Sequence, residues 1–148
     1  METNIRGIEC TLYNSAIKEV LLFLANISCD FYIPWCLQID RKESLIPLGM
    51  QIGHISAQGL KRVANCGIWE LVLHMFQTGG LYEKIETYSD FRTSACMCCL
   101  IYYDCGLLDL YIKDPGLLEK IYNYLLFLGA EEIALITDSS DGRALLHL

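Results

Sequence analysis

A strand–turn–strand–helix pattern over residues 97–128 constrains the fold of this chain more than any other feature. Two apolar stretches, 97–103 and 107–113, are separated by Asp-Cys-Gly at 104–106, which predicts a hairpin whose glycine takes the left-handed position. The Asp-Pro pair at 114–115 is typical of the start of a helix. The chain is therefore expected to build antiparallel strand pairs with helices packed against them.

The remaining sequence adds further strands and helices to this unit. Periodic apolar residues predict strands at 5–12, 30–40, 45–52, 68–77 and 132–137, with a final strand at 143–148. Helices are predicted at 16–27 after a cap at Asn14 or Ser15, at 57–66 after Ser56, from the Thr87–Asp90 capping box to 95, and at 115–128. This order predicts one α+β domain over residues 1–148, with a mixed or mainly antiparallel sheet and about three to four helices packed on it.

The strand at 30–40 contains a proline. Pro34 has no N–H to donate to a neighbouring strand, so this strand is expected at a sheet edge or with a bulge. Trp35 alternates with apolar residues along the same strand, and we expect its side chain in the core.

Composition excludes several classes of protein. With 53% hydrophobic and 20% charged residues, the chain has enough apolar surface to fold. No apolar stretch is long enough for a membrane span, and the N-terminus lacks a secretory signal, so a cytoplasmic protein is expected. The formal net charge of −7 argues against nucleic-acid binding, which requires a basic surface.

The chain has 8 cysteines, and Cys96 and Cys99 form a C-x-x-C motif. A zinc site needs four converging ligands, and a second such pair is missing. In an extended strand, Cys96 and Cys98 would point to one face and Cys99 to the other. We therefore interpret the thiols as core residues, with a metal or redox site as the alternative. The sequence indicates no cofactor and has no phosphate-binding loop.

Two places hold candidate functional residues, although none forms a catalytic signature. His74 lies four residues after Glu70, on the same face of its predicted strand, where a carboxylate could orient an imidazole. We favour a surface or partly buried histidine on the sheet over such an acid–base pair, because the sequence shows no partnered nucleophile. Asp138, Asp141 and Arg143 follow a predicted strand, where they form either a polar turn or a binding loop.

Charge is distributed unevenly along the chain. Residues 1–74 have 7 acidic and 6 basic side chains, whereas residues 75–148 have 11 acidic and 5 basic ones. A one-sided negative field steers a basic partner, so one hypothesis is a non-enzymatic interaction module of the inhibitor or immunity type that binds a basic protein. The alternative is an enzyme or small-ligand-binding protein whose site uses Glu70, His74, Cys36 or the Asp138–Arg143 loop. The oligomeric state is not indicated.

Three segments resemble a small bacterial family of uncharacterised proteins, a domain of unknown function. They are Ile136-Thr137-Asp138-Ser139-Ser140-Asp141-Gly142-Arg143, Glu86-Thr87-Tyr88-Ser89-Asp90-Phe91 and Phe31-Tyr32-Ile33-Pro34-Trp35. The resemblance implies a bacterial cytoplasmic protein and adds no activity.

Overall fold

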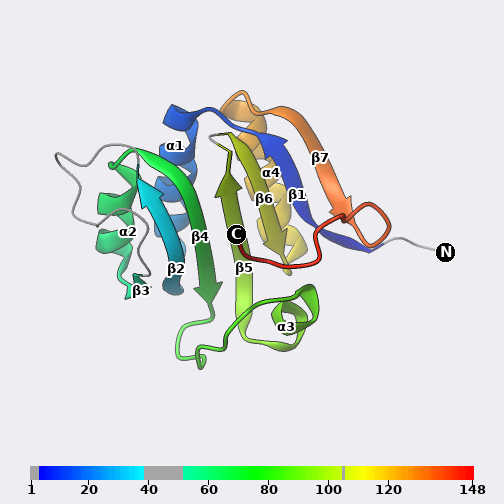
Figure 1. The fold of residues 1–148 in the computed structure, drawn as a ribbon, viewed down its shortest axis with the longest axis horizontal. Coiled ribbons are helices and arrows are strands. Elements are labelled where there is room, and N and C mark those ends of the chain that lie inside the picture. The colour runs from blue at the N-terminus through cyan, green and yellow to red at the C-terminus, as the bar shows by residue number, and fades with distance from the viewer. Residues whose placement is uncertain (1–3, 39–51, 105) are drawn as a thin grey trace.

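The computed structural model describes residues 4–38, 52–104 and 106–148, and their strands form a single seven-stranded sheet (Figure 1). The strands are β1 (Ile5–Thr11), β2 (Asp30–Gln38), β3 (Gly53–Ile55), β4 (Ile68–Phe76), β5 (Cys96–Tyr103), β6 (Leu107–Ile112) and β7 (Glu131–Thr137). They lie in the order β3-β2-β4-β5-β6-β1-β7, and neighbouring strands are antiparallel. The helices of this part are α1 (Asn14–Ala25), α2 (Ala57–Ala64), α3 (Tyr88–Thr93) and α4 (Pro115–Phe127). The predicted α+β class is confirmed.

The two faces of the sheet are covered differently. Helices α1, α2 and α4 pack on one face, here called the helix face, and bury the larger apolar core there (Figure 1). Of the described residues, those that cover the opposite face, called the open face, are α3, the segment before it and the C-terminal segment 138–148, which crosses in front of the strands in Figure 1. Among the described residues, no helix is long and apolar enough to cross a membrane.

Local capping residues begin three of the helices as predicted. The Ser56 hydroxyl accepts from the N–H of Gly59 at the start of α2, and Thr87 and Asp90 form the capping box of α3. The Asp114 carboxylate accepts from the N–H of Leu117 in α4. The prediction for α1 is wrong: its N-cap is Tyr13, which makes no side-chain capping bond, and the helix begins earlier than expected.

A bulge in β2 changes the direction of Trp35. Tyr32 pairs with His74 and Trp35 pairs with Val72, so β2 advances three residues where β4 advances two. The predicted bulge around Pro34 is confirmed. Because the bulge reverses the alternation, Trp35 shares the open face with Tyr32 and is half-buried there, so its expected core position is wrong.

A second bulge changes the faces of the C-x-x-C motif. Met75 pairs with Cys98 but Phe76 pairs with Cys96, and this shift breaks the alternation. Cys96 and Cys99 therefore lie on the open face and Cys98 lies on the helix face, contrary to the prediction. All three side chains are buried, and burial raises the pKa of Cys96 to about 12. Buried thiols with raised pKa values pack as small apolar groups, which supports the structural interpretation.

Two further predictions differ from the structure. In the β5–β6 hairpin the left-handed residue is Asp104, with φ of 51°, instead of the glycine. The final strand expected at 143–148 does not form; this segment lies across the open face, where Leu146 is buried. The strand predicted at 45–52 lies mainly in 39–51, outside the described residues.

Candidate functional site

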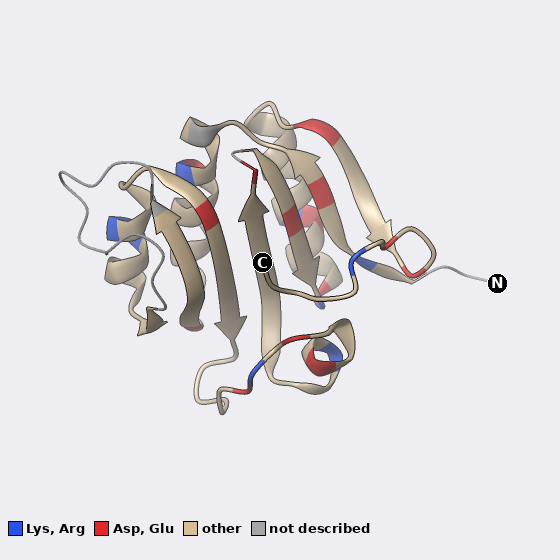
Figure 2. Ribbon diagram, in the orientation of Figure 1, with Lys and Arg blue, Asp and Glu red and all other residues tan. Residues whose placement is uncertain are grey.

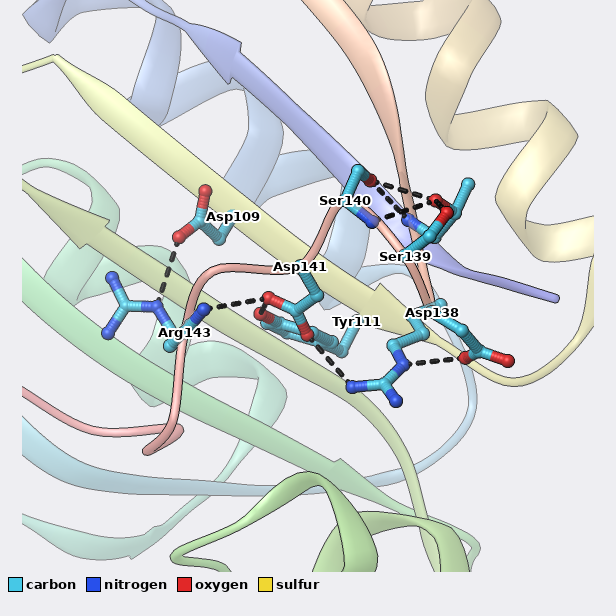
Figure 3. Close-up of polar contacts among 9 residues, drawn as sticks. Asp109, Tyr111, Asp138, Ser139, Ser140, Asp141 and Arg143 are labelled. Atoms are coloured by element: carbon cyan, nitrogen blue, oxygen red, sulfur yellow. Dashed lines mark hydrogen bonds and ion pairs between the residues drawn. The ribbon is translucent and has the colours of Figure 1, made fainter. Parts of the chain in front are cut away.

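A network of charged side chains fixes the C-terminal segment to the open face (Figure 3). The Asp141 carboxylate accepts hydrogen bonds from Arg6 Nη1 at 3.1 Å, from the Tyr111 hydroxyl at 3.0 Å and from the backbone N–H of Arg143 at 3.1 Å. Arg6 also binds Asp138 at 2.8 Å, and its guanidinium lowers the pKa of that carboxyl group. Strand β1 and the turn after β7 are joined by these contacts.

Arg143 extends the network to β6. Its Nε lies 3.2 Å from an Asp109 oxygen, which also accepts from the Tyr103 hydroxyl at 3.2 Å. Its Nη1 donates to the carbonyl oxygens of Leu145 and His147, and so bends the last residues around the guanidinium. We call this set the tail-anchoring network: Arg6, Tyr103, Asp109, Tyr111, Asp138, Asp141 and Arg143.

A hollow of about 380 Å³ lies beside this network and includes Glu9 in its wall. Burial and the negative charges of Asp109 and Asp141 raise the pKa of Glu9. The other carboxylates of the wall already have donors within the protein, so the geometry of this hollow explains the position of the C-terminal segment without a ligand.

A larger hollow of about 570 Å³ lies over β2 and β4, on the other side of the C-terminal segment. We call it the aromatic pocket, and the residues of its wall used below are Tyr32, Trp35, His74, Tyr82, Lys84, Glu86 and His147. The C-terminal segment closes one side, because the buried Leu146 donates its N–H to the carbonyl of Glu86 at 2.8 Å. The strands, the segment before α3 and the chain end thus meet at this pocket.

Aromatic contacts hold the pocket walls in place. The rings of Tyr32 and Tyr82 are stacked, with their centroids 3.8 Å apart, and Tyr82 also contacts Phe76 edge-to-face at 5.3 Å. The indole N–H of Trp35 donates to Glu70 Oε1 at 3.1 Å, which fixes the orientation of the indole.

His74 is the buried polar residue of this pocket. Its side chain is on β4, the residue is only 2% exposed, and neither ring nitrogen has a hydrogen-bond partner within the described part of the chain. Burial lowers the pKa of His74 to about 4, so its imidazole is neutral at physiological pH. An unsatisfied buried donor or acceptor costs about 1–3 kcal/mol, and such a group in a native protein requires an explanation.

The structure separates the residues that the sequence singled out. Glu70 and His74 share the open face as predicted, but Glu70 binds Trp35 instead of orienting the imidazole. Cys36 is buried on the helix face, away from the aromatic pocket, and burial raises its pKa to about 12.

Asp138, Asp141 and Arg143 do meet, within the tail-anchoring network. Sequence reasoning did not find their partners, because these come from distant strands: Arg6, Tyr103, Asp109 and Tyr111. It also missed Tyr82 and His147 as pocket residues. Within the described residues, no three His, Cys, Asp or Glu side chains are grouped so as to hold a metal ion.

Comparisons with known proteins identify relatives of this chain. It is 31% identical to the uncharacterised protein YncE of Bacillus subtilis (strain 168) over 109 residues, which are 74% of this chain and 71% of that protein. No solved structure matches it. The model of a family described as "Protein of unknown function (DUF2691)" matches residues 60–147, a range that contains His74, Tyr82 and all but the last residue of the C-terminal segment. The chain belongs to this bacterial family, in agreement with the resemblance of its C-terminal segment.

Proposed function

We propose that this protein binds a small organic molecule in the aromatic pocket. The observation that carries the proposal is the buried imidazole of His74, which has no hydrogen-bond partner among the described residues and lies in the wall of a cavity that also has aromatic residues. A polar group held without a partner lowers the stability of the protein alone, whereas a ligand that bonds to it gains affinity.

The size and composition of the cavity support this proposal. Small-molecule sites have volumes of roughly 300–1,000 Å³, with apolar and aromatic walls and a few polar groups that fix orientation. The aromatic pocket, at about 570 Å³, has Tyr32, Trp35 and Tyr82 in its walls and His74 as a buried polar group. Its base is a β-sheet and its side is the anchored C-terminal segment, so it is formed before a ligand arrives.

The His74 ring can present a nitrogen to a ligand with little rearrangement. The ring borders the cavity, and a half-turn about its Cβ–Cγ bond exchanges each nitrogen with a carbon while the ring keeps nearly the same shape.

The tryptophans offer a direct test. Trp35 is in the pocket and Trp69, 45% exposed, is the other tryptophan of the chain, so Trp69→Phe leaves one reporter in the pocket. A set of one- and two-ring aromatic fragments is titrated against this variant and against Trp35→Phe. We expect some fragments to change the fluorescence of Trp35 and to leave Trp69 unchanged. Fragments that bind nowhere, or that affect only Trp69, would contradict the proposal.

As a second candidate, we propose binding of a basic protein at the acidic half of the open face. Acidic positions occur on β6, on β1 and at the start of β7 (Figure 2). The raised pKa of Glu9 supports it, because Asp109 and Asp141 contribute to that rise and a cation would relieve it. Co-purification at low and high salt concentration tests this candidate. We expect a basic protein to co-purify with wild type at low salt, to dissociate at high salt and to be absent with Glu9→Lys. If no specific protein co-purifies at either salt concentration, the candidate is contradicted.

We also propose the cytoplasm as the compartment of this protein. The seven cysteines of the described part are free, and oxidising compartments favour disulfides.

A further inference from the structure

The chemistry of the aromatic pocket indicates what kind of molecule it binds, an inference that rests on the proposed function. We infer that the ligand is an uncharged heteroaromatic molecule whose ring edge carries both a hydrogen-bond donor and an acceptor, and that this edge bonds to His74.

The first step concerns charge. The charged side chains in the pocket wall are Lys84 and Glu86, which form an ion pair with each other at 2.9 Å and are 79% and 49% exposed. They lie at the solvent side, and each already has a counter-charge. An ammonium group placed against His74 would therefore lose its hydration without gaining an opposite charge, and a carboxylate would gain one only by protonating an imidazole whose charged form is disfavoured by burial, so both are unfavourable there.

The second step concerns the polar edge. A neutral imidazole has one N–H donor and one acceptor nitrogen, and the nitrogen that faces a ligand has either role, depending on the tautomer. A ligand edge with an N–H next to a carbonyl, as in a lactam, matches both tautomers. Because both nitrogens of His74 lack partners in the described chain, no other residue there fixes the tautomer.

The third step concerns shape. Tyr32 and Tyr82 stack with their planes 14° apart, and the Trp35 indole is held by Glu70. These rings give the cavity rigid, flat walls, and a planar aromatic molecule gains stacking or edge-to-face contact with such walls. A flexible chain would fill the same volume with a larger loss of conformational entropy.

Three bicyclic probes of similar size test the inference: isoquinolin-1(2H)-one with its lactam edge, the anion 1-naphthoate and the cation 1-naphthylmethylammonium. Binding to the full chain is followed by NMR through the indole N–H signal of Trp35, which is assigned with Trp35→Phe. We expect the lactam to bind about tenfold or more tightly than either charged probe. His74→Leu should weaken lactam binding by about tenfold and leave the charged probes nearly unchanged, whereas His74→Gln, which keeps a donor and an acceptor, should retain part of the affinity.

The outcomes separate the ligand class from the proposed function. Tighter binding of 1-naphthoate or the ammonium probe, or equal affinity for all three, would overturn the inferred class while pocket binding stands. Unchanged lactam affinity in a folded His74→Leu variant, checked by circular dichroism, would overturn the role of His74. If no probe shifts the Trp35 signal, both the class and the proposed function fail.

Discussion

The two halves of the open face differ in the hydrogen bonding of their buried polar groups. Around β6, β1 and β7, the buried Asp109 and the nearly buried Asp141 carboxylate each have an arginine and a tyrosine hydroxyl as partners. Over β2 and β4, the equally buried His74 has no hydrogen-bond partner within the described chain. Burial is therefore common to the two halves, and the hydrogen bonds of the buried groups distinguish them.

The difference assigns separate roles to the two halves. Partnered charges in the tail-anchoring network offset their own desolvation and hold the C-terminal segment in place. Within residues 4–38, 52–104 and 106–148, no hydrogen bond compensates the desolvation of the His74 imidazole, which is typical of a group that functions by contacting another molecule. The tail-anchoring network is thus structural, and it positions the C-terminal segment that forms one wall of the aromatic pocket.

The largest effect is expected from Asp141→Ala. This change leaves the Tyr111 hydroxyl without its acceptor and removes one of the two carboxylates bound by Arg6. The change also removes the acceptor of three hydrogen bonds, and because a hydrogen bond to a charged group contributes about 1.5–3 kcal/mol, we expect the free energy of unfolding by urea to decrease by about 3–5 kcal/mol. Hydrogen exchange at the Leu146 amide, which binds Glu86 across the pocket, should accelerate.

Asp141→Asn is the matched variant, because its amide keeps one acceptor oxygen, and an intermediate loss is expected. Glu119→Gln, at an exposed position of α4, should change stability by less than about 0.5 kcal/mol. A loss below about 1 kcal/mol in Asp141→Ala would show that the network does not hold the C-terminal segment.

The pH dependence of stability should differ between wild type and His74→Leu. The folded pKa of His74 is about 4, against 6.5 for an exposed histidine. Between these values the unfolded chain binds a proton that the folded chain does not, so this group lowers the free energy of unfolding as pH falls from about 7 to 4. In wild type this group lowers the free energy of unfolding by about 3 kcal/mol over that pH range, and the effect is absent from His74→Leu.

The stability of His74→Leu relative to wild type should therefore increase as the solution is acidified. Glu9 and Asp109, whose pKa values are raised, act in the opposite direction, but they are present in both proteins and cancel in the difference. Parallel pH profiles in urea unfolding would mean that His74 has a partner or is hydrated.

The smallest effect is expected at Glu70. Glu70→Leu removes the acceptor of the Trp35 indole and should reduce stability by about 1 kcal/mol, shift the Trp35 emission and weaken ligand binding a few-fold. Glu70→Gln keeps a carbonyl acceptor and should resemble wild type. Identical behaviour of Glu70→Leu and wild type in all three measurements would exclude a positioning role for Glu70.

Sequence reasoning predicted those parts of the fold that local interactions determine. The caps at Ser56, Thr87 and Asp114 act within four residues, and strand alternation located β4 and β6. Bulges change a strand's faces through its pairing with another strand, so the directions of Trp35 and Cys96 were predicted incorrectly. The proline pointed to the first bulge, whereas no single residue indicated the second.

Sequence reasoning predicted less of the candidate sites, because their contacts also join residues that are distant in the chain. Asp138, Asp141 and Arg143 could be selected as a polar loop, but Arg6 lies more than 130 residues from its two acidic partners. His74 could be placed on the same face as Glu70, but the cavity beside it also takes its walls from Tyr82 and from the C-terminal segment, which meet it only in the folded chain.

The free energy of unfolding of His74→Leu at pH 7, measured together with its affinity for isoquinolin-1(2H)-one, tests the central claim most directly. If His74 is kept for binding, its replacement by an apolar residue should stabilise the protein by about 1–3 kcal/mol and weaken the affinity by about tenfold. A variant that is less stable than wild type, with unchanged affinity, would contradict the account and make His74 a structural residue.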